Sequence, residues 1–258
     1  MAKLNYSYKT RRSDTLTNRM MIVFVLMCLG VFLLSSIKNW LISDSSVPYL
    51  ETYMKLLPYL PIIPLVLFAV TLFFFFKNKK ADKDEALKTF SSSFILSLAL
   101  VVLVVSLLVS NFAYKGYVPS IIFVVLASLL YFVAISFPGS YFLMALFNSL
   151  GAFSLYALNL ISPISHRVQD IIARVVVIAL ALFFLFFFMK NRKDGKILGT
   201  FKLITPNAHL LPILSAVVLF VVFVLLGMFS VGSFVIFDII LGIETIVFAL
   251  FYAIKMLK

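Results

Sequence analysis

Eight apolar stretches, separated by short polar links, dominate the sequence of this 258-residue chain. Each stretch is close to the ~20 residues that an α-helix needs to cross the hydrocarbon core of a bilayer. No link is long enough to fold as a soluble domain of its own. The pattern predicts an all-α polytopic integral membrane protein with eight transmembrane helices. These run approximately over 20–42, 57–76, 90–112, 118–137, 141–162, 170–189, 208–230 and 234–254.

The composition agrees with burial in lipid. Hydrophobic residues make up 63% of the chain and charged residues only 12%, whereas soluble domains carry about 25% charged residues. A soluble core of this size could not bury so much apolar surface, so the excess must face lipid. The single cysteine, Cys28, excludes an intramolecular disulfide and a thiol metal site. The first apolar stretch lacks a small-residue cleavage site, so we interpret it as a retained signal anchor.

The distribution of basic residues predicts the orientation. If the N-terminus lies in the cytoplasm, 17 of the 22 Lys and Arg residues fall in cytoplasmic segments. This agrees with the positive-inside rule and places both termini inside, N-in and C-in. A basic rim facing anionic lipids at the cytoplasmic face explains the net charge of +12 without nucleic acid. The Phe- and Lys-rich composition suggests a bacterial plasma membrane.

A repeated string predicts two similar halves. The residues Leu72–Lys80 and Leu185–Lys193 are identical at seven of nine positions, and each copy ends an apolar run at a basic patch. The turn signal Pro138-Gly139 separates the fourth and fifth stretches. We therefore expect a basic cytoplasmic N-terminal segment at 1–19, a first four-helix membrane unit at 20–137 and a second at 141–258. An even number of crossings per unit makes the repeat parallel, 4+4; convergence of two Phe-rich helix ends is the alternative.

Two acidic residues in the last apolar stretch are the most unusual feature of the predicted spans. Glu244 would lie ~15 Å from the outer end, near the bilayer midplane, and Asp238 ~6 Å in. A charge at that depth costs at least about 2.5–3.5 kcal/mol, so it should face protein, water or a ligand. Glu244 is either a proton- or cation-binding residue or a hydrogen-bonded residue that joins helices.

Other polar residues in the second half are expected near these acids. Arg174 would share the depth of Asp238, which predicts an ion pair between them, with Asp170 competing for the guanidinium group. Asn148 lies near the predicted level of Glu244, and contact between them would form a polar centre. Gly151 and Ser154 have the spacing of a small-residue packing pattern.

Three prolines, Pro58, Pro61 and Pro64, open the second apolar stretch. Only 12 residues follow Pro64 before Lys77, too few to cross ~30 Å of hydrocarbon. The helix should therefore be kinked or unwound at the prolines, or begin irregularly at the outer interface, which is the simpler account.

Known catalytic motifs are missing from the sequence, so we expect no enzyme activity. It contains no H-E-x-x-H, G-x-S-x-G, P-loop or dinucleotide-binding motif. His166 and His209 would lie on opposite faces of the membrane, so neither a metal nor a cofactor is expected. Two functions remain. The first is a multi-pass transporter or permease-like protein with a polar path through Glu244, Asn148, Asp238 and Arg174. The second is a non-catalytic membrane subunit or scaffold with membrane protein partners in a larger complex.

Overall fold

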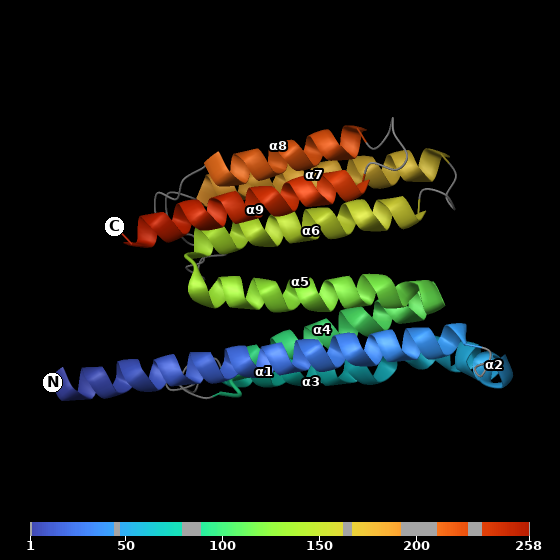
Figure 1. The fold of residues 1–258 in the computed structure, drawn as a ribbon, viewed down its shortest axis with the longest axis horizontal. Coiled ribbons are helices and arrows are strands. Elements are labelled where there is room, and N and C mark those ends of the chain that lie inside the picture. Colours follow the sequence, from blue (N-terminus) through green and yellow to red (C-terminus); the bar gives the residue numbers. More distant parts are fainter. Residues whose placement is uncertain are drawn as a thin grey trace. The chain divides into compact units, whose positions relative to one another are not determined.

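The computed structural model describes residues 2–43, 47–78, 89–161, 167–191, 211–226 and 234–257. The described part of the chain is helical and contains no strand. The chain divides into two compact units, unit 1 (Met1–Tyr131) and unit 2 (Phe132–Lys258). In each unit, the long helices that follow one another along the chain run in opposite directions, as Figure 1 shows.

The described residues of unit 1 form five α-helices and two short 3₁₀ helices, η2 and η4. The segments are α1 (Ala2–Ile42), α2 (Val47–Leu56), η2 (Leu57–Tyr59), α3 (Ile62–Asn78), α4 (Ser92–Phe112), η4 (Ala113–Gly116) and α5 (Tyr117–Ser136), whose last residues belong to unit 2. Unit 2 then contains α6 (Gly139–Ile161), α7 (Arg167–Asn191), α8 (Leu211–Leu226) and α9 (Phe234–Leu257). A helix is present at each of the eight apolar stretches.

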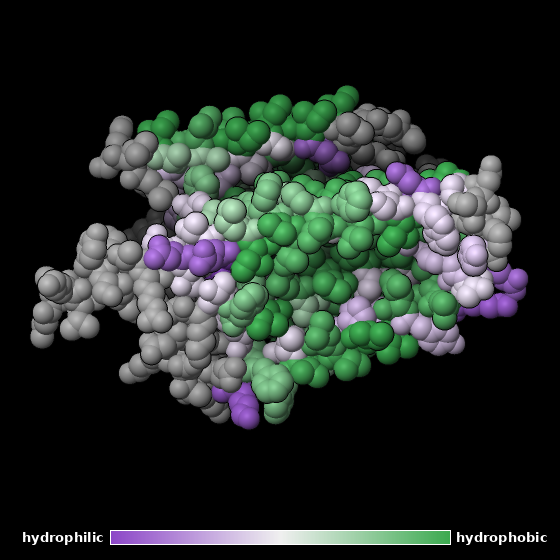
Figure 2. Space-filling view, turned by 60° about the horizontal axis from the view of Figure 1, so that its bottom comes forward, coloured by the Kyte–Doolittle hydropathy of each residue, from purple (hydrophilic) through white to green (hydrophobic). Residues whose placement is uncertain are grey.

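Among the described residues, four helical segments are long and apolar enough to cross a membrane: Ser13–Ile42, Tyr49–Lys77, Ser92–Ser136 and Ile236–Ile254. The third contains 45 residues, twice the ~20 that one crossing needs. It consists of two helices, α4 and α5, because η4 reverses the chain between them. Figure 2 shows hydrophobic side chains gathered in a broad band along the helices, with hydrophilic residues toward the helix ends.

The three prolines divide the second apolar stretch into two helices. Pro58 lies in the first turn of η2, and α3 begins only at Ile62. Pro64 follows in the first turn of α3, where its missing N–H costs no helical hydrogen bond. The helix α2 lies in a segment that the sequence analysis treated mainly as a polar link. Its exposed Lys55–Glu51 ion pair, 2.7 Å long, joins successive turns.

The turn between α4 and α5 is unusually tight. Ala113 adopts a left-handed φ of 49°, which ends α4. Gly116 then packs against the last turns of α4, where a Cβ atom on Gly116 would lie 2.3 Å from the carbonyl oxygen of Leu108. Only glycine fits at this position without a shift of the backbone.

Aromatic and aliphatic side chains close this end of unit 1. A buried cluster joins α1, η2, α4 and α5 through Leu41, Leu57, Val109 and Tyr117. The hydroxyl groups of Tyr53 in α2 and Tyr117 in α5 are 3.0 Å apart and share a hydrogen bond. The cluster thus holds α2 against the ends of α1, α4 and α5.

The four described helices of unit 2 pack together as a bundle. The helix α6 packs against α7, α8 and α9, and α8 packs against both α7 and α9. The buried positions Tyr141, Met144, Asn148 and Leu155 of α6 repeat with the three- and four-residue spacing of one helix face. On α9 the buried positions Phe237, Leu241, Glu244 and Tyr252 follow the same rule. The polar residues Asn148 and Glu244 therefore lie on the faces by which α6 and α9 meet.

Several predicted features lie outside the described residues. The basic segments at 79–88 and 192–210 are among them, and they include the last two residues of each copy of the repeated string. His166 and His209 also lie outside the described residues. Nothing is described of the side chain of Asp170.

Candidate functional site

Glu244 is the buried acidic residue at the centre of unit 2. It lies near the middle of α9, and 9% of its surface is exposed. The neighbouring Ile243 and Ile246 are exposed and face away from the bundle. The face of α9 that carries Glu244 is therefore turned toward the other helices of unit 2. This agrees with the expectation that an acid in an apolar helix faces protein.

Asn148 of α6 binds this carboxyl group directly. Its Nδ2 atom donates to Oε2 of Glu244 at 3.2 Å and also to Oγ1 of Thr245 at 3.0 Å. Asn148 is 3% exposed, so the amide is held inside the bundle. The contact that the sequence analysis expected between Asn148 and Glu244 is present in the structure.

Neighbouring hydroxyl groups extend this polar centre. The hydroxyl of Thr245 donates to the carbonyl of Leu241 at 2.8 Å, one turn earlier in α9. Tyr141 of α6 donates to the carbonyl oxygen of Thr245 at 3.0 Å. Ser215 of α8 lies beside the Glu244 carboxyl group. Three helices of the bundle therefore contribute polar groups around a single acid.

Three oxygen atoms in unit 2 are buried without a hydrogen-bond partner among the described residues. They are Oδ1 of Asn148, Oε1 of Glu244 and Oδ1 of Asp238. Buried polar atoms in proteins are nearly always paired, because an unpaired one loses its hydration with no compensation. All three atoms are acceptors, so a proton or a small cation is the kind of species that would satisfy them.

Arg174 lies in the interior of unit 2 but is directed toward α8. Its side chain is among the most buried in the protein, at 2% exposure, and its Nη1 atom donates to the carbonyl oxygen of Val224 at 3.3 Å. Val224 is in the last turn of α8, where carbonyl groups have no helical partner and the helix dipole is negative. The guanidinium group thus binds the C-terminal end of α8.

The expected ion pair between Arg174 and Asp238 is not among the interactions of the described residues. Asp238 instead has a buried Oδ1 atom without a partner there, and Arg174 binds the backbone of α8. Both α7 and α9 pack on α6 and α8. The end of α8 offers the guanidinium group an acceptor that sequence-based depth matching did not consider.

The small residues of α6 serve packing. A Cβ atom on Gly151 would lie 2.9 Å from Cδ2 of Phe220, so α6 and α8 approach closely at this glycine. The Ser154 hydroxyl donates to Leu150 of its own helix at 2.7 Å. Both residues line an apolar cavity of about 300 Å³ between α6, α7 and α8. This part of unit 2 therefore lacks the polar character of the Glu244 region.

The sequence analysis missed Tyr141, Thr245 and Ser215 as members of the polar centre. Tyr141 could have been found, because it precedes Asn148 by two helical turns and shares its face. Thr245 directly follows Glu244 in the sequence. Ser215 carries no comparable signal, since its position depends on how α8 packs. Among the described residues, no group of three or more His, Cys, Asp and Glu side chains is arranged to hold a metal ion.

Comparisons with known proteins bring no assignment. No protein family model matches the sequence, and neither a curated protein nor a solved structure is significantly similar to it.

Proposed function

We propose that this chain is a multi-pass membrane transporter whose second unit carries a proton- or cation-binding site at Glu244. The single observation that supports this proposal is the buried carboxyl group itself. It has one oxygen bound by Asn148 and the other without a partner among the described residues. Intramembrane acids that face a bundle interior are typical of proton and ion pathways.

The proposal includes eight crossings of a bacterial plasma membrane, with both termini in the cytoplasm. The eight apolar stretches, the basic residues of the cytoplasmic links and the helix break before Gly139 support this topology. The two units would then be parallel four-helix halves. Glu244 and Asn148 would form the centre of the path, with Asp238 nearer the outer end of α9.

The orientation can be tested with single cysteines in a Cys28→Ala background. Glu51→Cys and Lys115→Cys should react in intact cells with a maleimide that cannot cross membranes. Asp14→Cys and Lys77→Cys should react only after the cells are opened. Labelling of Asp14→Cys from outside would contradict the proposed orientation.

Transport can be tested in proteoliposomes. We would measure proton flux with a trapped pH-sensitive dye and uptake of radiolabelled sodium, for the wild type and for Glu244→Gln. The matched control is Glu51→Gln, because Glu51 lies on the exposed surface of α2. We expect flux in the wild type and in Glu51→Gln, and loss of flux in Glu244→Gln. Equal flux in all three proteins would remove Glu244 from the pathway.

A second candidate function is a non-catalytic subunit of a larger membrane complex. The observation that favours it is the exposure of the Tyr49–Lys77 segment, whose most apolar part has no residue buried within the chain. In a complex, this face could pack against another membrane protein. The subunit function predicts that a defined protein copurifies with the chain in mild detergent, at a constant ratio. A monodisperse lone chain with flux activity would argue against it.

A further inference from the structure

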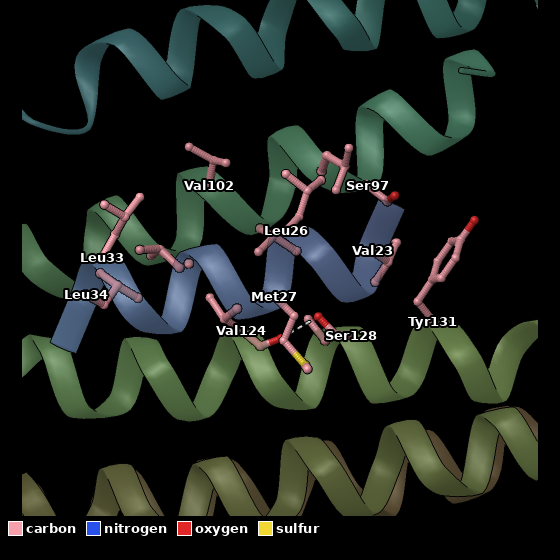
Figure 3. Close-up of a pocket in the computed structure, with 15 residues that line it drawn as sticks. Val23, Leu26, Met27, Leu33, Leu34, Ser97, Val102, Val124, Ser128 and Tyr131 are labelled. Carbon is pink, nitrogen blue, oxygen red and sulfur yellow. Dashed lines mark hydrogen bonds between the residues drawn. The ribbon is translucent and has the colours of Figure 1, made fainter. Parts of the chain in front are cut away.

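An apolar groove of about 510 Å³ lies within unit 1, between α1, α4 and α5. Figure 3 shows its lining residues. Val23, Met27 and Leu34 come from α1, Val102 from α4, and Val124 and Tyr131 from α5. The volume lies within the range of about 300–1,000 Å³ that is typical of small-molecule sites.

The walls of the groove are chemically suited to a hydrocarbon chain. Two serines line it, but each hydroxyl group is bonded within its own helix. Ser97 donates to the carbonyl of Phe94 at 2.7 Å, and Ser128 donates to that of Val124 at 2.8 Å. The groove therefore offers few polar groups along its length, and a polar ligand would lose its hydration without gaining partners.

The dimensions of the groove fit one acyl chain of a lipid. From Val23 to Leu34 it follows α1 for about 16 Å, at 1.5 Å per residue. One leaflet of the hydrocarbon core is about 15 Å thick, which is half of ~30 Å.

A basic side chain lies beside one end of the groove. Tyr131 closes this end, and the Arg19 side chain lies within hydrogen-bonding reach of its hydroxyl group. Arg19 is held there by a 3.0 Å hydrogen bond from Nε to the carbonyl of Thr89 and by the ring of Phe94, 6.0 Å from its Cζ. The N-terminal turn of α4, capped by Ser91, begins beside it, and its dipole adds positive potential.

We infer that this groove binds one anionic phospholipid of the bilayer. One acyl chain would lie along α1 between α4 and α5, and the phosphate group would meet Arg19 and the first turn of α4. The site goes beyond the proposed transport function, and it involves none of the residues around Glu244.

The experiment compares lipid retention by native mass spectrometry of the purified full-length chain. The protein is incubated in detergent with dioleoyl phosphatidylglycerol, which is anionic, or with dioleoyl phosphatidylcholine, which is zwitterionic. We expect one phosphatidylglycerol molecule per chain. Its affinity should be about fivefold higher than that of phosphatidylcholine, because one basic residue near an anionic headgroup contributes about 1 kcal/mol. Equal retention of the two lipids would overturn the assignment of the headgroup to Arg19.

Two pairs of variants test the site. Leu26 lines the groove and Leu29, on the same helix, is exposed outside it. Leu26→Trp should weaken lipid retention about tenfold, because its larger side chain would keep about two methylene groups of the acyl chain out of the groove. Leu29→Trp should retain lipid as the wild type does. Arg19→Gln should remove the preference for phosphatidylglycerol, and Arg19→Lys should keep part of it.

Folding of each variant is checked by its elution profile and melting temperature. If Arg19→Gln does not fold, the comparison of Leu26→Trp with Leu29→Trp still tests whether the groove binds lipid. Equal retention by Leu26→Trp and Leu29→Trp would overturn the groove as the site. A dimer mass in place of the lipid adduct would also overturn it. Glu244→Gln should keep full lipid retention, so failure of the lipid site and failure of the transport proposal are separate results.

Discussion

The side-chain amide of Asn148 on α6 donates to the carboxyl group of Glu244 on α9 at 3.2 Å, although the two residues are 96 positions apart in the chain. The same nitrogen also donates to Thr245 at 3.0 Å. One amide group thus joins the first and last helices of unit 2 at the level of the buried acid.

Asn148→Ala should destabilise unit 2, because it removes both hydrogen bonds and leaves Oε2 of Glu244 without its donor. We expect a loss of about 1–2 kcal/mol in the free energy of unfolding, the range measured for strong interhelical bonds in membranes. Unfolding in mixed micelles with increasing denaturing detergent would measure it. The matched control is Asn111→Ala, since Asn111 is exposed and, among the described residues, donates to Leu107 of its own helix. Equal losses in the two variants would contradict a special role for Asn148.

Gly116→Ala should destabilise the α4–α5 turn. The new Cβ atom would lie 2.3 Å from the Leu108 carbonyl oxygen and 2.9 Å from Cα of Val109, and both are backbone atoms that cannot rotate away. We expect a loss of about 1–3 kcal/mol and a lower melting temperature. Gly242→Ala is the control, because a Cβ atom there meets nothing within 4 Å. A stable Gly116→Ala protein would show that the turn can relax.

Arg174→Met should destabilise the bundle by about 1–3 kcal/mol, because the carbonyl of Val224 loses a charged donor. Lys190→Met, at an exposed position near the other end of α7, should have little effect. Melting temperatures in detergent would compare the two.

The same contact predicts the outcome of a charge swap. Arg174→Asp combined with Asp238→Arg should be no more stable than Arg174→Asp alone, because Arg174 binds the end of α8. If the double variant were more stable than either single variant, an ion pair between these positions would be the better account.

Tyr117→Phe should loosen α2 from unit 1, because it removes the hydrogen bond to Tyr53, in which the oxygens are 3.0 Å apart. A net loss of about 0.5–1.5 kcal/mol is expected. Hydrogen exchange of the α2 amides should then become faster, while exchange in unit 2 stays unchanged. Tyr114→Phe is the control, since Tyr114 is exposed in the same turn. Unchanged exchange in α2 would show that the bond does not hold this helix.

Much of the helical architecture could be predicted from the sequence, because the length of an apolar run is fixed by the membrane and is visible without any contact information. The break at Pro138 and Gly139 was predictable for a similar local reason, as Pro and Gly act on their own backbone. The helix α2 was not predicted, because Glu51 and Lys55 make its sequence resemble a polar link. Its position depends on the packing of Leu57 and Tyr53 against the end of unit 1.

The candidate site was predictable only in part. Glu244 is conspicuous in the sequence because acids are costly in the hydrocarbon, and matched depth was enough to suggest Asn148 as its partner. The partner of Arg174 could not be predicted in this way. Its acceptor is the backbone carbonyl of Val224, and every residue has such a group. Only the end of α8 makes that carbonyl available.

The positive φ of Ala113 and the four residues of η4 also affect how the protein is made. The helices α4 and α5 are joined by only the four residues of η4, so in the proposed topology they form a helical hairpin. They should leave the insertion channel together as a preformed hairpin, with the carbonyl groups of each helix already satisfied. Lys115 is the one charged residue between Ser92 and Ser136. In the proposed orientation, insertion of this pair of helices therefore moves only one charged side chain across the membrane.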